Sequence, residues 1–220
     1  MINKIKELIN ENNLDGYILP KNDKYFTEYS IKNNLKIVSN FSGSSGFAVI
    51  LKNKNYLFVD GRYTIQAKKE AGKKFKIIEI PYKWPKDIFK NLNIGFDPKL
   101  FTHSILYRYF KNDCNLIAIN QKIFNEKCKI EKKSAFFLIN NKVSGESAVS
   151  KINKITKLLK RKKLNNLYIS SGENVCWLLN IRGSDLPNSP VANCKLILTQ
   201  SKKIYFFSPK YKILNIKNKF

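Results

Sequence analysis

Each half of this chain contains two short apolar segments joined by a lysine-rich turn. Of all the features of the sequence, this repetition places the strongest limit on the fold that the chain can adopt. The segments read VILKNKNYLF at 49–58 and LILTQSKKIYFF at 196–207. Short runs rich in β-branched and aromatic residues on either side of a polar turn predict β-hairpins. A pattern that occurs twice at so long a period indicates two copies of one fold, because a solenoid repeats at short periods and more than twice.

The segments around the first hairpin predict alternating helices and strands. Apolar residues at helical spacing predict a helix at the N-terminus, and LDGYIL at 14–19 predicts a buried strand that Pro20 ends. After the hairpin we expect a helix at 63–71, a strand at 75–80, a helix at 85–91, a strand at 93–96, a helix from Thr102 to Lys111 and a strand at 115–119. Helices that alternate with strands predict an α/β domain of two or three layers.

The second half of the chain begins the same series again. A helix at 144–163, a strand at 166–170, a short helix at 173–180 and the second hairpin follow in that order. The later helices and strands of the first copy have no counterpart before Phe220. We therefore expect two tandem α/β domains, at 1–125 and 126–220, with the boundary in the loosely patterned segment NEKCKIEKKS and the second domain truncated.

The loop NFSGSSGFAV at 40–49 contains glycines and serines that could cradle a phosphate. Such loops bind phosphate when they open directly onto a helix, whose first amides face the anion. Here the loop opens onto the apolar run Phe47–Leu51, which is predicted to be a strand. The sequence therefore does not favour a nucleotide site.

The net charge of +25 would suit a nucleic-acid-binding protein, but its distribution does not. Almost all of the positive charge is lysine scattered along the chain, and the arginines are Arg62, Arg108, Arg161 and Arg182. Specific recognition needs basic residues gathered on one face. We expect nonspecific, salt-sensitive binding to polyanions, and a true nucleic-acid binder stays an alternative whose affinity would survive physiological salt.

The sequence predicts a cytoplasmic protein without membrane contact. No apolar stretch approaches the roughly 18 residues that would span a bilayer. The N-terminus MINKIKELINENN interrupts its apolar positions with charge, unlike a secretory signal. Buried, reduced thiols are expected at Cys114, Cys128, Cys176 and Cys194, which form neither a C-x-x-C pair nor a dense disulfide pattern.

Two motifs resemble one enzyme family. The segments FSGSSGFAVI and YLFVDGRYTIQA, followed by ENVCWLLNIRGSDLPNSPV, are similar to the N-terminal region of the Xaa-Pro aminopeptidases of the aminopeptidase P type. The resemblance covers nearly the whole chain. It implies two creatinase/prolidase N-terminal-like domains, each a mixed sheet flanked by helices, which precede a catalytic domain of the pita-bread fold. The enzyme removes an N-terminal residue preceding proline. Because family members are commonly dimers or larger, it also implies a homo-oligomer.

The resemblance implies cofactors that this chain is not expected to hold. Family members bind two divalent metal ions, usually manganese, in the catalytic domain, on aspartate, histidine and glutamate ligands that suit paired ions able to activate water. This sequence contains one histidine, His103, and no H-E-x-x-H motif. We expect His103 to be an ordinary, partly buried residue, and the chain alone to be catalytically inactive.

Arg62 is the candidate substrate-binding residue. In FVDGRY the strand is expected to end at Asp60, Gly61 permits a tight exit, and Arg62 is left pointing from the strand end. Arginine presents a rigid set of donors that fits a carboxylate or a peptide carbonyl. The resemblance implies that Arg62 reaches toward the active-site cleft and contacts the bound peptide. The alternative is a structural ion pair with Asp60 or with another domain, and the two roles are compatible.

The second motif predicts a braced turn. Arg182 and Asp185 in RGSD are expected to hold it through hydrogen bonds from side chain to backbone. Ala192 and Asn193 stand where the family usually carries an aromatic pair. If that pair packs on the catalytic domain, the contact is weakened here. Trp177, which has apolar neighbours, is expected in the core or at an interface rather than as a binding platform.

These observations lead to one main hypothesis. The chain is expected to be the noncatalytic N-terminal region of a metal-dependent Xaa-Pro aminopeptidase, helping to associate subunits and to shape the substrate entrance. Its partner would be the catalytic domain, and it would meet the peptide substrate only together with that domain. The alternative is a stand-alone module that uses the same fold to bind other proteins.

Overall fold

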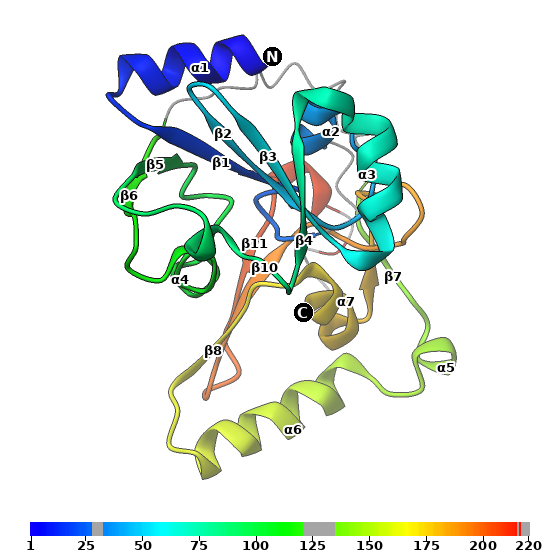
Figure 1. Ribbon diagram of the computed structural model, residues 1–220. Coiled ribbons are helices and arrows are strands. Elements are labelled where there is room, and N and C mark those ends of the chain that lie inside the picture. The colour runs from blue at the N-terminus through cyan, green and yellow to red at the C-terminus, as the bar shows by residue number, and fades with distance from the viewer. Residues whose placement is uncertain (28–32, 121–134, 215, 217–220) are drawn as a thin grey trace. The chain divides into compact units, whose positions relative to one another are not determined.

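The computed structural model describes residues 1–27, 33–120, 135–214 and 216 (Figure 1). The chain divides into two compact units, unit 1 at Met1–Glu126 and unit 2 at Lys127–Phe220. The segment NEKCKIEKKS, where the domain boundary was expected, lies outside the described residues. Each unit is therefore described by itself.

Unit 1 has the alternation of helices and strands that its sequence predicts. Its elements are α1 (Ile2–Glu11), β1 (Gly16–Pro20), α2 (Asn34–Ser39), β2 (Phe47–Leu51), β3 (Asn55–Asp60), α3 (Thr64–Ala71), β4 (Lys76–Ile80), β5 (Asn93–Phe96), α4 (His103–Phe110) and β6 (Asn115–Ala118). The strands form one six-stranded mixed sheet in the order β4-β3-β2-β1-β5-β6. β2 runs antiparallel to both β1 and β3. The other neighbouring pairs, β3–β4, β1–β5 and β5–β6, are parallel.

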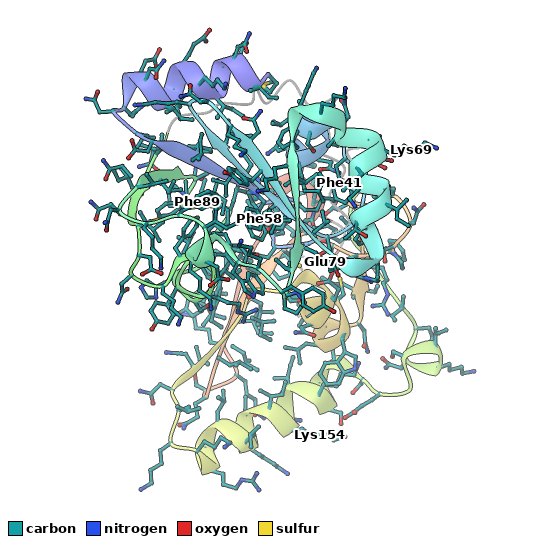
Figure 2. All side chains as sticks on the ribbon, viewed as in Figure 1. Phe41, Phe58, Lys69, Glu79, Phe89 and Lys154 are labelled. Atoms are coloured by element: carbon teal, nitrogen blue, oxygen red, sulfur yellow. The ribbon has the colours of Figure 1, made fainter. Side chains whose placement is uncertain are left out.

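Apolar side chains alternate between the two faces of this sheet, so both faces are covered. On one face, residues of β1 to β3 pack against α1, α2 and α3 in a buried cluster that includes Leu19 and Leu57. On the other face, Phe58 and its neighbours pack against α4 and the segment that contains Phe89. Figure 2 shows Phe58 and Phe89 close together, and their ring centroids are 6.3 Å apart. The sheet is thus the middle layer of a three-layer unit.

Local signals in the sequence set the helix ends of unit 1. The hydroxyl of Thr102 accepts a hydrogen bond from the amide of Ile105 at 3.3 Å and so caps α4, as expected. α3 ends at Gly72, whose φ of +58° suits a residue without a Cβ. The helix expected at 85–91 is wrong: only the 3-10 turn Pro85–Asp87 forms there. The amide of Asn91, where φ is +56°, donates instead to the carbonyl of Asp113 at 2.7 Å.

Unit 2 is smaller. Its elements are β7 (Phe137–Leu138), α5 (Asn141–Ser144), α6 (Ala148–Arg161), β8 (Asn166–Ile169), α7 (Gly172–Leu179), β9 (Ile181–Arg182), β10 (Lys195–Thr199) and β11 (Ile204–Phe207). β8, β10 and β11 form an antiparallel sheet in the order β11-β10-β8, and β7 pairs with β9. The helix expected at 144–163 begins later, because the hydroxyl of Ser147 caps it through the amide of Ser150.

The strand registers show that the two units repeat one arrangement. In unit 1, Ile18 of β1, Val49 of β2 and Tyr56 of β3 lie opposite one another across three strands. In unit 2 the corresponding row is Tyr168 of β8, Ile197 of β10 and Tyr205 of β11. The next row on the same face of each sheet pairs Phe47 with Phe58 in unit 1 and Lys195 with Phe207 in unit 2.

The predicted fold class, two tandem α/β domains of one type with the second one smaller, is therefore confirmed. Helices α6 and α7 and the three strands of unit 2 enclose one apolar cluster, which takes the place of the cluster under α1 and α2 in unit 1. Among the residues that the structure describes in unit 2, none forms a counterpart of β4, β5, α4 or β6.

Candidate functional site

The candidate site of unit 1 is the turn that follows β3. β3 ends at Asp60, whose Oδ1 accepts a hydrogen bond from the amide of Arg62 at 3.0 Å. This bond caps the 3-10 turn Gly61–Tyr63, which leads directly into α3. The turn is therefore held by a rigid strand on one side and a helix on the other, as a binding side chain requires.

Asp60 also holds the guanidinium group of Arg62. Nε donates to Oδ1 at 3.0 Å and Nη2 donates to Oδ2 at 2.8 Å, so the pair is bidentate. The guanidinium carbon lies 5.1 Å from the ring centroid of Tyr63. The hydrogen bond from Arg62 lowers the pKa of Asp60 below its usual value. The side chain of Arg62 is 72% exposed.

The Ser/Gly loop lies against this turn. The hydroxyl groups of Ser44 and Tyr63 are 2.8 Å apart, and the ring of Phe41 meets that of Tyr63 edge-on at 5.8 Å. Gly43 has no room for a side chain, because a Cβ there would lie 2.2 Å from the ring of Phe41. Gly46 has φ of +145°, and a Cβ would lie 2.8 Å from the carbonyl oxygen of Phe58. The glycines thus pack the loop against Phe41 and β3, and the loop opens onto β2, which argues against a phosphate cradle.

α3 anchors the start of the same loop. Glu70 accepts hydrogen bonds from the amide of Ser42 at 2.7 Å and from its hydroxyl at 2.8 Å. Gln66, one helical turn earlier, donates to Ser42 and to Glu70, each at 3.0 Å. Sequence reasoning named Arg62 but missed Gln66 and Glu70. Their spacing of four residues on a predicted helix was the available signal, but nothing in it indicated which loop they would meet.

We expect the start of the Ser/Gly loop to loosen in acid. The hydrogen bond from the Ser42 amide, followed by that from Gln66, lowers the pKa of Glu70 from its usual 4.5. A lowered folded pKa contributes stability that is present above the unfolded value and is lost as the pH falls through the folded value. Amide exchange at Ser42 should therefore quicken as the pH falls from about 5 to about 2, after correction for intrinsic exchange. A Glu70→Gln variant that keeps the same pH response would contradict this.

In unit 2, the RGSD motif forms the braced turn that was predicted. Nη1 of Arg182 donates to the carbonyls of Ile181 at 2.8 Å and of Cys176 at 3.3 Å. Asp185 accepts from the amide of Asn193 at 2.7 Å. The sequence did not reveal that Asp185 also forms a buried ion pair with Lys212, 2.5 Å away, in which both side chains are only 3% exposed.

A second buried cation joins α6 to the end of α7. The ammonium group of Lys151 donates to the carbonyl of Trp177 at 2.8 Å and to Oδ1 of Asn180 at 2.7 Å. Burial lowers the pKa of Lys151. Asn180, at φ of +54°, also donates to the carbonyl of Glu146 at 2.8 Å, which satisfies both ends of its amide. These contacts close a polar network inside unit 2 and have a structural role.

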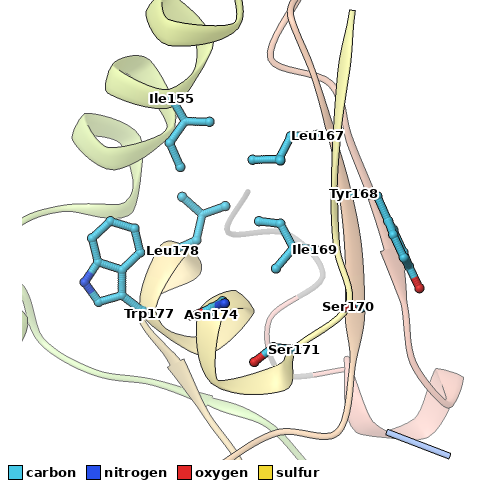
Figure 3. A pocket seen from close by; sticks show the side chains of 9 residues that line it. All are labelled: Ile155, Leu167, Tyr168, Ile169, Ser170, Ser171, Asn174, Trp177 and Leu178. Carbon is cyan, nitrogen blue, oxygen red and sulfur yellow. The ribbon is translucent and has the colours of Figure 1, made fainter. Parts of the chain in front are cut away.

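Trp177 is not a core residue, which corrects part of its prediction. It is about half exposed, at the rim of a groove of about 370 Å³ between α6, β8 and α7 (Figure 3). The groove is lined by Ile155, Leu167, Tyr168, Ile169, Ser170, Ser171, Asn174, Trp177 and Leu178. Figure 3 shows Tyr168 pointing away from it. Because none of the side chains that line it is charged, the groove offers no group for acid–base chemistry.

The sequence also led to predictions about the burial of His103 and of the cysteines. His103 is the first residue of α4 and is exposed, stacked on Tyr107, so the expectation that it is partly buried is wrong. Cys176 and Cys194 are buried thiols, Cys114 is half-buried, and Cys128 lies outside the described residues.

The described part of the chain contains neither a candidate metal site nor a candidate membrane-spanning helix. Across residues 1–27, 33–120, 135–214 and 216, no three His, Cys, Asp or Glu side chains come together in a way that could hold a metal ion. None of the helices that the structure describes combines the length and the apolarity needed to cross a bilayer.

Comparison with known proteins accounts for nearly the whole chain. Residues 1–123 and 126–220 each match a creatinase/prolidase N-terminal domain. The chain is 28% identical to a probable Xaa-Pro aminopeptidase P of Laccaria bicolor, over 92% of this chain and 34% of that protein. It is also 28% identical to Xaa-Pro aminopeptidase 1 of Dictyostelium discoideum, over 99% of this chain and 38% of that protein.

A solved structure agrees with these matches. The crystal structure of X-prolyl aminopeptidase from Caenorhabditis elegans, described as a cytosolic enzyme with a di-nuclear active site, has a TM-score of 0.85 and 25% identity. The match covers 96% of this chain and 38% of that one. This chain therefore spans little more than a third of the length of the relatives it matches.

Proposed function

Because the chain belongs to the creatinase/prolidase N-terminal domain family, we propose that it acts as the noncatalytic N-terminal region of a metal-dependent Xaa-Pro aminopeptidase. The observation that carries this proposal is the match along both units to about the first third of such enzymes. In this role the chain helps to associate subunits, as a homodimer or larger, and shapes the entrance for the peptide. The description of the C. elegans relative supports a cytosolic location for the whole enzyme.

The metal ions belong to another part of such an enzyme. Two divalent cations need several carboxylate and imidazole ligands around a shared centre. The described residues bring no such group together, and His103, the only histidine of the sequence, is exposed on α4. The residues that the structure describes thus do not fit a two-metal site. The proposal assigns this chain to binding and positioning and assigns the chemistry to the remainder of the enzyme.

Arg62 is the residue that we assign to the peptide. Its guanidinium group is already oriented by Asp60, so little side-chain entropy would be lost when it binds a peptide carbonyl or carboxylate. Its exposure at the end of β3 leaves room for a ligand from outside unit 1. A positioned arginine of this kind would hold the substrate near the metal ions rather than take part in bond cleavage.

The proposal is tested by reconstitution. The wild-type protein is mixed with the C-terminal remainder of the D. discoideum relative, its sequence beyond the part that aligns with this chain, and hydrolysis of a Xaa-Pro tripeptide is measured with Mn²⁺. We expect a complex whose kcat/KM exceeds that of the remainder alone. Arg62→Lys, which keeps the charge but loses the bidentate geometry, should lower kcat/KM about tenfold or more.

Arg108→Lys is the matched control, since Arg108 is an exposed arginine on α4. It should leave kcat/KM unchanged, and neither substitution should shift the melting temperature of the 220-residue protein by more than about 2 °C, as exposed charges contribute little to stability. If no complex forms, the proposed function is wrong. If a complex forms and Arg62→Lys behaves like Arg108→Lys, the assignment of Arg62 is wrong.

A further inference from the structure

The Ser/Gly loop between α2 and β2 is fixed near its start and at its end. Near its start, Glu70 accepts two hydrogen bonds from Ser42, at 2.7 and 2.8 Å. At its end, the carbonyl of Gly46 accepts a hydrogen bond from the amide of Lys21 at 3.1 Å. The loop therefore holds Ser44, which lies between these two anchors, in a defined position.

Tyr63 connects this loop to Arg62. Its hydroxyl lies 2.8 Å from that of Ser44. Its ring meets the ring of Phe41 edge-on at 5.8 Å, and the guanidinium carbon of Arg62 lies 5.1 Å from its centroid. Tyr63 is half-buried, whereas Arg62 is exposed. Because the loop restricts the ring of Tyr63, the ring in turn limits where the guanidinium group can lie.

The ion pair with Asp60 does not by itself give Arg62 a fixed orientation. Its two hydrogen bonds align the guanidinium group with the carboxylate. Both residues belong to one surface turn, however, and an exposed ion pair of this kind is weak. The ring of Tyr63 contacts the guanidinium group from a second direction. A side chain that must present its donors to a substrate needs this kind of support.

We propose that Tyr63 and Ser44 are positioning residues for Arg62. The Ser/Gly loop fixes the hydroxyl of Tyr63 through Ser44, and the ring of Tyr63 holds the guanidinium group in the orientation that receives the peptide. Both residues act through Arg62 and take no part in bond cleavage. This inference rests on the proposed function, which assigns Arg62 to the peptide, and it gives the Ser/Gly loop a role in substrate binding.

A structural role for the same hydrogen bond makes different predictions. If the bond between Ser44 and Tyr63 only ties the loop to the start of α3, its loss lowers the fraction of folded protein and thus kcat, whatever residue stands at position 62. If the bond orients Arg62, its loss weakens peptide binding and raises KM, and it does so only while Arg62 is present. Kinetics therefore separate the two roles.

The test uses the full 220-residue protein combined with the C-terminal remainder of the D. discoideum relative. Hydrolysis of a Xaa-Pro tripeptide is measured over a range of concentrations with Mn²⁺. Tyr63→Phe keeps the ring and removes the hydroxyl, and Ser44→Ala removes its partner. Each should raise KM about threefold to tenfold, as expected for one lost hydrogen bond, and change kcat less than about twofold. The double variant should be no worse than either single variant, because both break one bond.

Two substitutions on α4 are the matched controls. Ser104→Ala breaks a hydroxyl pair of the same kind, since the hydroxyl oxygens of Ser104 and Thr102 are 3.0 Å apart. Tyr107→Phe removes the hydroxyl of a tyrosine that is 52% exposed. Both controls should leave KM and kcat at the wild-type values, because neither residue contacts the turn that follows β3.

A double-mutant cycle with Arg62→Ala tests the coupling directly. Arg62→Ala should raise KM about tenfold or more, because it removes the group assigned to the peptide. Adding Tyr63→Phe to Arg62→Ala should then change KM less than about twofold, since no guanidinium group remains to be oriented. An equal rise in KM in both backgrounds would show that Tyr63 acts independently of Arg62 and would overturn the inference.

The remaining outcomes separate this inference from the proposed function. If no complex forms, the proposed function fails and this inference fails with it. If Arg62→Ala leaves KM unchanged, the assignment of Arg62 and this inference are both wrong. If Arg62→Ala raises KM while Tyr63→Phe behaves like Tyr107→Phe, or lowers kcat at an unchanged KM, the proposed function stands and Tyr63 does not position Arg62.

Discussion

Replacing Lys212 by methionine is expected to destabilise unit 2 by about 3–5 kcal/mol, because it leaves the carboxylate of Asp185 buried without its counter-charge. Both side chains are only 3% exposed, and their charged atoms are 2.5 Å apart. The penalty is large because a buried carboxylate that loses its partner keeps its desolvation cost and loses the attraction that offset it. Of the side-chain hydrogen bonds formed with described residues, Asp185 would keep the one from the Asn193 amide at 2.7 Å.

The two tryptophans allow this effect to be measured in one unit. The sequence contains Trp84 in unit 1 and Trp177 in unit 2, so a Trp84→Phe background reports unfolding of unit 2 by fluorescence. Urea unfolding in this background should give the expected loss for Lys212→Met. In the double variant Asp185→Asn/Lys212→Met, the amide oxygen can still accept from Asn193, and both charges of the Asp185–Lys212 pair are removed. It should recover more than half of the lost stability.

Two results would contradict the predicted role of the pair. A loss below about 1 kcal/mol for Lys212→Met would place the pair among exposed ion pairs, which contribute that little. A double variant as unstable as the single one would show that the packing of the lysine stem, and not its charge, accounts for the loss.

Much of the fold could be predicted because the repeated hairpins are strong local signals. β2–β3 and β10–β11 consist of short apolar runs on either side of a polar turn, and both formed as expected. The helix expected at 85–91 failed because its end is decided by a distant partner: the amide of Asn91 bonds to the carbonyl of Asp113 across the unit. Such a contact has no signal in the segment itself.

The candidate site was predicted less completely than the fold. The Asp60–Arg62 pair could be named because both residues lie in one short turn, two positions apart. The residues that support this turn could not be named, because Glu70 meets Ser42, 28 positions away in the sequence, through the packing of α3 on the sheet. Lys212 and Asp185 are likewise separated by 27 positions, and an isolated lysine in a lysine-rich chain gives no sign that it is buried.

The comparison of the two units could also not be made from the sequence alone. The hairpins suggested a repeat, but only strand register shows that Lys195 stands in the place of Phe47, and Phe207 in that of Phe58. Shifting the pairing by one residue would have turned these side chains to the inner face. The register therefore shows which side chains of the unit 2 sheet face its buried cluster and which face away from it.

The central claim, that this chain positions substrate but does not cleave it, is tested most directly by assaying the pure 220-residue protein on a Xaa-Pro tripeptide with excess Mn²⁺. A hydrolytic two-metal site needs clustered ligands, and the described residues provide no group of three. We predict hydrolysis indistinguishable from buffer and no protein-bound manganese after gel filtration. Hydrolysis that rises with protein concentration, requires Mn²⁺ and is abolished by a chelator would contradict the claim.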